Sequence, residues 1–465
     1  MQKIYIKNFG AIKEAEIEIK SLLVLIGEQA SGKSTIAKLI YFFKSLNDDF
    51  FNQFYKSDKD YLDITSDLII PIREKYYDFF GSTFYLPEFE IKYCYSEVKW
   101  LRLSLYPRTK KLRTEFSRGF LSESLKSDLR NIKTSINKVE LKIHVAKSSH
   151  EQLALEQEKI KYIQQLSNLI NTSFENNHDD ALFMIAGRNA TVGYSDLFEK
   201  YLFTRIQIRL DDNRKQGSFK KKEQTIDETL MLKFMERVIK IKALFEKYGN
   251  VEGLISSLPD NARNRESLLL AKMKIDEILK GNYLIDRWGE KILHDNDHYV
   301  FLHNASSGQQ EVIRILQDIF VVIFEQQKSL RWIEEPEAHL FPVAQKLVIE
   351  LFALMINQNS SNQLIITTHS PYVLTVINNL LFAKRVIDKN ISKKEDVFKI
   401  IPEPFLLEPE NFNAYSLGNS EVYCESVFNE KTGLIKQSYL DTVSEMLSSD
   451  FNNLYSIHAQ TFARK

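Results

Sequence analysis

A phosphate-binding loop motif constrains the fold of this 465-residue chain more than any other feature. Residues 27–35 read Gly-Glu-Gln-Ala-Ser-Gly-Lys-Ser-Thr, which fits the pattern G-x-x-x-x-G-K-[ST]. The apolar run at 22–26 predicts a strand buried on both faces, and the apolar periodicity from about 33 to 46 predicts a helix. Because a helix after such a loop directs its positive end at bound phosphate, this order indicates a parallel α/β sheet with a phosphate-bearing ligand.

The loop itself provides most of the ligand contacts that we predict. Lys33 is placed to reach the β- and γ-phosphates of a nucleotide, and the Ser34 hydroxyl is placed to hold Mg²⁺. The predicted nucleotide-binding positions in the loop are Gly27, Ala30, Ser31, Gly32, Lys33, Ser34 and Thr35. A glycine turn without a nucleotide is the alternative, but a chance match is expected in only about 1–2% of chains of this length. We therefore predict ATP with Mg²⁺ as the ligand.

A strand that ends in acidic residues is the second chemical feature. Residues 330–337 read Leu-Arg-Trp-Ile-Glu-Glu-Pro-Glu. Beside a phosphate loop, one acid at such a strand end can organise Mg²⁺, and the next can orient or deprotonate the attacking water. We assign Glu334 to the metal and Glu335 to the water. An acidic strand end is a weak signal by itself, so this assignment depends on the loop at 27–35.

A histidine follows a further apolar strand. Residues 365–371 read Ile-Ile-Thr-Thr-His-Ser-Pro, roughly 34 residues after the acids. We predict that His369 lies at the tip of this strand, where it can donate to a γ-phosphate and distinguish ATP from ADP. A lone histidine is more often structural, and the spacing from the acids favours the catalytic role.

The fourth segment is a helix start with small polar residues. Residues 304–311 read Asn-Ala-Ser-Ser-Gly-Gln-Gln-Glu and precede an apolar-periodic helix. Free N–H groups at such a start suit an anion, although an ordinary helix cap has the same pattern. By itself the segment cannot be told from such a cap, and its value lies in its position before the acidic strand.

In this order the four segments resemble the head of an ABC-type ATPase. They correspond to the Walker A loop, the Ser-Ser-Gly-Gln-Gln signature, the Glu-Glu-Pro-Glu Walker B segment and the switch histidine. The match is closer to RecF-like, SMC-like and OLD-type ATPases than to transporters, and it covers most of 1–45 and 281–380. The resemblance implies nucleotide contacts for Ser307, Gly308 and Gln310. It also implies slow ATP hydrolysis in which the facing copy supplies Ser307 and Gly308 to the γ-phosphate. Two ATP molecules would then be enclosed in an isologous dimer, alone or within a larger even-numbered ring.

Two positions depart from the family pattern. Glu334 stands where many relatives have aspartate, and Gln309 stands where transporters have glycine. The glutamate extends the reach of the metal acid by one methylene group. Arg188 resembles an arginine that follows a strand in related ATPases, and both a functional role and a structural ion pair are open for it. The glutamine loop of the family cannot be placed in this sequence.

A long helical stretch separates the motifs. Apolar residues repeat with 4-3 spacing from Leu125 to Ile143, and a second helix runs to about Asn171. We predict a hairpin at about 121–171, either a short projecting coiled coil or a pair packed flat on the body.

The predicted fold is α/β, an ABC-type ATPase head in which a parallel RecA-like sheet and an antiparallel β-subdomain carry this helical insertion. Its predicted units are 1–110 with Walker A, 111–280 with the hairpin, and 281–465 with the signature, Walker B and switch histidine. A strand at 181–186 can return from the insertion to the head.

Composition limits the compartment and the partners. Lys plus Arg equals Asp plus Glu at 62 each, so a field strong enough to hold nucleic acid is not expected, although 214–222 is locally basic. The two cysteines suggest a reducing compartment. The start of the chain lacks the features of a signal peptide, and no apolar run approaches membrane-spanning length. We therefore predict a cytoplasmic protein without a membrane partner.

The biological role is predicted from a finer resemblance. The segment after His369 has no acidic cluster that resembles Toprim, so nuclease or toxin action is expected from a separate chain. The loop, hairpin and signature resemble bacterial anti-phage ATPases, first the ATPase subunit of PARIS systems and next that of Septu systems. The alternatives are a DNA-repair ATPase of the RecF/SMC type that binds DNA directly, and an ATP-bound scaffold that sequesters an effector with little turnover.

Overall fold

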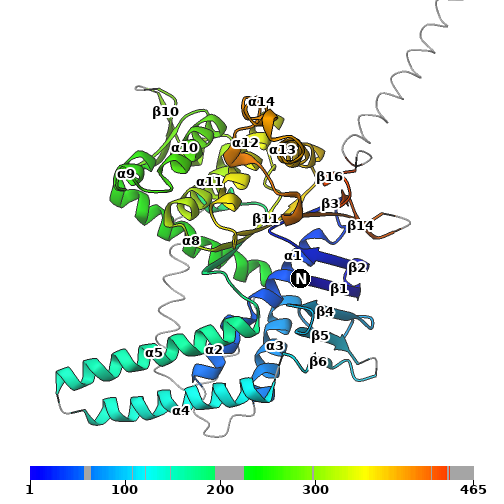
Figure 1. The fold of residues 1–465 in the computed structure, drawn as a ribbon, viewed down its shortest axis with the longest axis vertical. Coiled ribbons are helices and arrows are strands. Elements are labelled where there is room, and N and C mark those ends of the chain that lie inside the picture. Colours follow the sequence, from blue (N-terminus) through cyan, green and yellow to red (C-terminus); the bar gives the residue numbers. More distant parts are fainter. Residues whose placement is uncertain are drawn as a thin grey trace, which may run out of the picture.

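The computed structural model describes residues 1–56, 64–106, 108–120, 122–146, 148–193, 225–295, 298–419, 422–436 and 439. This part of the chain forms a six-stranded sheet, a five-stranded sheet, two small sheets of three and two strands, the helices around them and a projecting helical hairpin (Figure 1). None of the described helices combines the length and the apolar character needed to cross a membrane.

The larger sheet positions the predicted nucleotide loop. Its strand order is β14-β13-β3-β12-β11-β7, and every pair is parallel except β13 with β14. The strands are β3 (Leu22–Gly27), β7 (Asp180–Met184), β11 (Ser329–Glu334), β12 (Gln363–Thr368), β13 (Phe412–Leu417) and β14 (Cys424–Ser426). Because parallel strands end at one edge, the residues that follow β3, β7, β11 and β12 lie together there.

Helices cover both faces of this sheet. Successive residues of β3 point to opposite sides, so Leu22 and Val24 join one hydrophobic core while Leu23 and Leu25 join the other. The helix α1 (Lys33–Lys44) packs on the second side. The first side is covered by helices of the C-terminal half, namely α8 (Ile226–Tyr248), α9 (Val251–Ser256), α10 (Arg265–Leu279), α11 (Ser307–Glu325), α12 (Pro342–Gln358) and α13 (Pro371–Lys389).

The smaller sheet is antiparallel, with the order β2-β1-β4-β5-β6. Its strands are β1 (Gln2–Phe9), β2 (Ile12–Ile19), β4 (Glu90–Cys94), β5 (Trp100–Leu105) and β6 (Leu112–Phe116). Apolar and polar residues alternate along β1 and β2, and the apolar side chains face the core.

The predicted hairpin is present as α4 (Glu123–Val145) and α5 (Ser149–Ser173). Figure 1 shows it running away from both sheets, with α2 (Leu46–Lys56) beside its base. Only the part near the base is packed: Lys133 donates to the carbonyl oxygen of Tyr55 (2.5 Å), whereas Leu141 and Leu153 near the tip are exposed. The hairpin therefore projects from the body.

The remaining elements are short or lie between these units. They are α3 (Ile64–Phe80), α6 (Ala190–Gly193), β8 (Asn282–Asp286), β9 (Gly289–Leu293), β10 (Tyr299–Phe301), η1 (Leu302–Asn304), η2 (Ile391–Lys393), α14 (Lys394–Phe398), η3 (Glu403–Phe405), η4 (Pro409–Asn411), β15 (Phe428–Asn429) and β16 (Leu434–Ile435). The α/β fold class with a parallel and an antiparallel sheet is confirmed. The three-unit division stays a prediction, and the basic segment 214–222 lies outside the described residues.

Candidate nucleotide site

The loop between β3 and α1 has the conformation that its glycines allow. Gly27, Ala30 and Gly32 all have positive φ angles of 154°, 60° and 85°. A Cβ atom at Gly27 would lie 2.4 Å from the carbonyl oxygen of Leu417, so the close approach of β13 also requires glycine. The loop therefore wraps back toward its own strand before α1 begins at Lys33.

The Lys33 side chain lies inside this loop. Its Nζ donates to the carbonyl oxygens of Gly27 (2.8 Å) and Glu28 (2.7 Å). Burial lowers the pKa of Lys33, and the carboxylates of Glu335 and Glu337 oppose that shift. The loop thus holds an ammonium group directly beside acids from the β11 end, where a phosphate chain could replace the carbonyl contacts.

Glu334 ends β11 and keeps one carboxylate oxygen unused. Its Oε2 accepts from the backbone N–H of Ala186 (3.2 Å), while the buried Oε1 has no hydrogen-bond partner among the described residues. A buried, unpaired carboxylate oxygen fits a Mg²⁺ ligand, because Mg²⁺ in nucleotide sites takes one or two protein oxygens together with phosphate and water. Within the described ranges no group of three or more His, Cys, Asp or Glu side chains could hold a metal ion. Oxygens of phosphate and water would therefore have to complete the coordination of Mg²⁺.

Glu335, His369 and Lys33 form a continuous chain of polar side chains. Nε2 of His369 lies 3.3 Å from Oε1 of Glu335, and its Nδ1 lies 3.5 Å from Nζ of Lys33. Glu335 has a φ of 45°, a left-handed conformation unusual for a residue other than glycine. Its N–H donates to the carbonyl oxygen of Thr367 (2.8 Å). The structure therefore brings three predicted site residues from three different elements into contact.

Glu337 belongs to the same cluster, although the sequence analysis gave it no role. Its Oε1 accepts from the hydroxyl of Thr368 (2.6 Å) and from the N–H of His369 (2.8 Å). Its Oε2 is buried and unpaired among the described residues. Glu337 holds the turn that carries His369 against the turn after β11. In the sequence, the signal for this role was that Glu337 is the third acid of the Glu-Glu-Pro-Glu segment.

The signature segment begins α11 with a capping box. The Ser306 hydroxyl accepts from the N–H of Gln309, whose side-chain oxygen in turn accepts from the N–H of Ser306. Ser307 is exposed, and a Cβ atom at Gly308 would lie 2.6 Å from the carbonyl oxygen of His339. Gln310 donates to the carbonyl oxygens of His303 and Ala305, both at 3.0 Å.

Thus Ser307, Gly308 and Gln310 share no hydrogen bond with the loop at 27–35 in the part of the chain that the structure describes. Their nucleotide roles stay predictions.

The C-terminal strands supply loop contacts that the sequence analysis missed. The Tyr423 hydroxyl donates to the carbonyl oxygen of Ser31 (2.6 Å), and a Cβ atom at Gly418 would lie 2.8 Å from Cβ of Ser31. No motif marks this segment, because its contact with the loop arises only when β13 pairs with β3.

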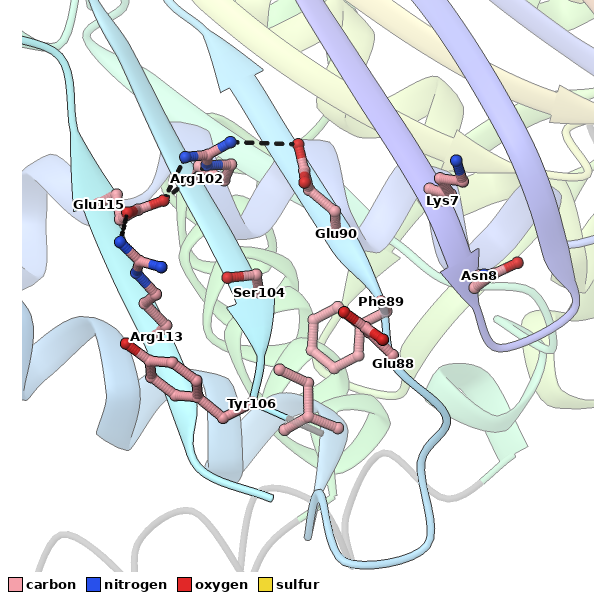
Figure 2. A pocket seen from close by; sticks show the side chains of 11 residues that line it. Lys7, Asn8, Glu88, Phe89, Glu90, Arg102, Ser104, Tyr106, Arg113 and Glu115 are labelled. Carbon is pink, nitrogen blue, oxygen red and sulfur yellow. Dashed lines mark hydrogen bonds and ion pairs between the residues drawn. The ribbon is translucent and has the colours of Figure 1, made fainter. Parts of the chain in front are cut away.

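A separate hollow of about 500 Å³ lies on the exposed face of the antiparallel sheet. Figure 2 shows Arg102 between Glu90 and Glu115, with Arg113 on the far side of Glu115. Because these charges pair with one another, Arg102 and Arg113 are not free to bind a phosphate chain.

The parallel sheet with its glycine loop, together with the antiparallel sheet, defines an ABC-type ATPase head. Residues 1–374 match the family AAA_15, described as an AAA ATPase domain, and the chain belongs to this family. Membership identifies the chain as a nucleotide-binding ATPase. No curated protein sequence matches it.

Three solved structures are similar at low sequence identity. One is an SmcHead bound to the C-winged helix domain of ScpA, with 10% identity, coverage of 91% of this chain and 96% of that chain, and a TM-score of 0.38. The second is an Smc head domain with an extended coiled coil, bound to the C-terminal domain of ScpA and derived from Pyrococcus furiosus. It has 12% identity, coverage of 81% and 92%, and a TM-score of 0.30. The third is the recombination mediator protein RecF-ATPrS of the RecFOR pathway, with 12% identity, coverage of 79% and 92%, and a TM-score of 0.23.

Proposed function

We propose that this chain hydrolyses Mg-ATP at the edge of its larger sheet. The observation that carries the proposal is the chain of contacts from Lys33 through His369 to Glu335. In the proposed reaction Glu335 orients and deprotonates the attacking water, and His369 donates to the γ-phosphate. Lys33 neutralises phosphate charge, while Ser34 and Glu334 hold the Mg²⁺ that offsets the remainder.

We further propose that two copies complete each site. Ser307 is exposed at the start of a helix whose N–H groups suit an anion, and within the described residues it forms no hydrogen bond with the loop of its own chain. A facing copy could therefore present Ser307 and Gly308 to the γ-phosphate bound at 27–35. ATP would then hold the dimer closed, and hydrolysis would open it.

The role we propose for this cycle is control of a separate effector in anti-phage defence. The resemblance of the loop, hairpin and signature to the ATPase subunit of PARIS systems supports it, and the effector would be a nuclease. The projecting hairpin gives such a partner an accessible surface away from the nucleotide edge (Figure 1).

The test combines mass and turnover. We would measure the solution mass of Glu335→Gln by light scattering with and without Mg-ATP, and ATP hydrolysis of the wild-type chain. ATP-driven assembly supports the shared site, whereas a monomer that binds ATP refutes it. Salt-sensitive DNA binding by the wild-type chain, without release of an effector on infection, would instead support the DNA-repair alternative.

A further inference from the structure

Arg188 is fully buried behind the acids of the Walker B segment. It lies just after β7, the edge strand beside β11, and 0% of its surface is exposed. Its Nη1 donates to the carbonyl oxygens of Glu334 (2.6 Å) and Ile185 (2.8 Å), and its Nη2 donates to that of Glu335 (3.0 Å). One planar guanidinium therefore fixes the backbone of both predicted site acids.

Glu311 of α11 holds this arginine in place. Its carboxylate lies 3.2 Å from Nη2 of Arg188 and accepts from the backbone N–H groups of Gly187, Arg188 and Asn189, at 3.1, 3.0 and 2.9 Å. Burial lowers the pKa of Arg188, and Glu311 is the first of the carboxylates that oppose this shift. Of the two roles that the sequence left open for Arg188, the structural ion pair is thus present.

The position of Glu311 connects this pair to the signature. Glu311 lies one turn of α11 after Ser307, so both residues share a helix face. A displacement of the start of α11 would therefore be transmitted to the backbone of Glu335 through the side chains of Glu311 and Arg188. Glu335 has a positive φ angle, a strained conformation for a residue other than glycine, and the contact of its carbonyl oxygen with Arg188 helps to hold this backbone.

We propose that Arg188 is a positioning residue that, through Glu311, couples the signature end of α11 to the backbone of Glu335. This inference rests on the proposed function, since it concerns when the water-orienting acid is correctly placed. A second copy that contacts Ser307 would press on α11, and Arg188 would set Glu335 for hydrolysis. Lysine at position 188 would keep the charge but could not bind three carbonyl groups in one plane.

The chain offers a matched control in a second buried arginine of the same kind. Arg331 is also 0% exposed, and its Nε donates to Asp318 (2.6 Å), which lies on α11 as Glu311 does. Arg331 also pairs with Asp180 at the far end of β7, and among the described residues it forms no hydrogen bond or ion pair with Glu334 or Glu335. Loss of the guanidinium group of Arg188 or of Arg331 should lower stability. Only the loss at Arg188 should affect Glu335.

The experiment compares Arg188→Lys, Glu311→Gln and Arg331→Lys in the full chain. We would measure kcat for ATP, the Kd of a non-hydrolysable ATP analogue with Mg²⁺, ATP-driven assembly by light scattering, and the melting temperature. Arg188→Lys and Glu311→Gln should each lower kcat by about 100-fold, with Kd and assembly unchanged. The two changes together should cost little more than one. Arg331→Lys should lower the melting temperature and leave kcat unchanged.

Two outcomes would overturn the inference. In the first, Arg188→Lys keeps the wild-type kcat. In the second, Arg188→Lys and Arg331→Lys lose activity equally, in proportion to the folded protein that remains. Failure of the proposed function would be recognised in the wild-type chain alone, as ATP binding without turnover, and this would remove the inference with it.

Discussion

Nε2 of His369 lies 3.3 Å from Oε1 of Glu335, although the two residues follow different strands of the larger sheet. The contact exists because β11 and β12 are parallel neighbours, with Glu334 paired to Thr367. A carboxylate and an imidazole that touch at a strand edge can handle a proton and a phosphate oxygen within one step.

The first prediction concerns Glu335→Gln. The amide keeps the shape of the carboxylate but cannot take a proton from water, so hydrolysis should fall at least about 100-fold while ATP still binds. The mass measured by light scattering should then rise with Mg-ATP and stay raised. ADP serves as the control, because it lacks the γ-phosphate and should not drive assembly. Wild-type turnover by the variant would contradict the role of Glu335.

The second prediction concerns Lys33→Ala, which removes the only side-chain cation that the loop at 27–35 contains. A hydrogen bond to a charged group contributes about 1.5–3 kcal/mol, so ATP affinity should fall at least about tenfold and hydrolysis should be lost. Binding of a fluorescent ATP analogue measures this directly. Lys38→Ala is the matched control on the same helix, because Lys38 pairs with Asp227 (2.5 Å) instead. Full hydrolysis by Lys33→Ala would show that this loop is not the nucleotide site.

The third prediction concerns the buried carboxylate of Asp318. It accepts from Nε of Arg331 (2.6 Å) and Nε of Arg237 (2.7 Å). Burial alone would raise the pKa of Asp318, but the two guanidinium groups outweigh it and hold the pKa below 3.8. The carboxylate therefore stabilises the fold above about pH 4, and this stabilisation is lost as the pH falls further.

Asp318→Asn should lower the free energy of unfolding by about 3–5 kcal/mol at pH 7, because it removes the carboxylate that two guanidinium groups share. The difference from the wild-type chain should shrink below pH 4, because the unfolded chain binds a proton there before the folded Asp318 does. Urea denaturation at pH 7, 5, 4 and 3 measures both effects. A variant that is equally destabilised at every pH would rule out the ionised pair as the cause.

How much of this molecule its sequence predicts depends on the range of the interactions involved. The strand β3 was predicted because a continuous apolar run marks a strand buried on both faces, and the helix α1 because its apolar residues repeat every 3.6 residues. The strand β13 was not predicted: Asn413 and Ser416 are polar yet buried, and Asn413 donates to the Tyr415 hydroxyl (3.2 Å). Periodicity fails where buried polar groups satisfy one another.

The candidate site divides in the same way. Lys33, Glu335 and His369 were predicted from local motifs, and the sheet brings them together. The Arg188–Glu311 pair joins residues far apart in the chain, and no spacing rule connects them. The contact forms because β7 pairs with β11 in parallel, which places the loop after β7 against α11. It could therefore be found only in the folded structure.

The last prediction concerns Lys44, at the end of α1 and on the side of the sheet opposite the nucleotide edge. It lines a cavity of about 290 Å³ together with His178 and Ser361, and no described carboxylate pairs with it. Lys44 is half-buried, and the partial loss of water around its ammonium group lowers the pKa of Lys44 to about 7. An unfolded lysine has a pKa near 10.4, so between about pH 7 and 10 the unfolded chain binds more protons and stability rises with pH.

The cost of the buried charge is fully present below about pH 7. Lys44→Met should therefore raise the melting temperature at pH 6.5, and its advantage over the wild-type chain should shrink steadily toward pH 9.5. Lys38→Met provides the comparison, since it removes an ion-paired lysine from the same helix and should lower stability. If Lys44→Met gave the same advantage at pH 6.5 and 9.5, the gain would come from apolar packing and not from removal of a buried charge.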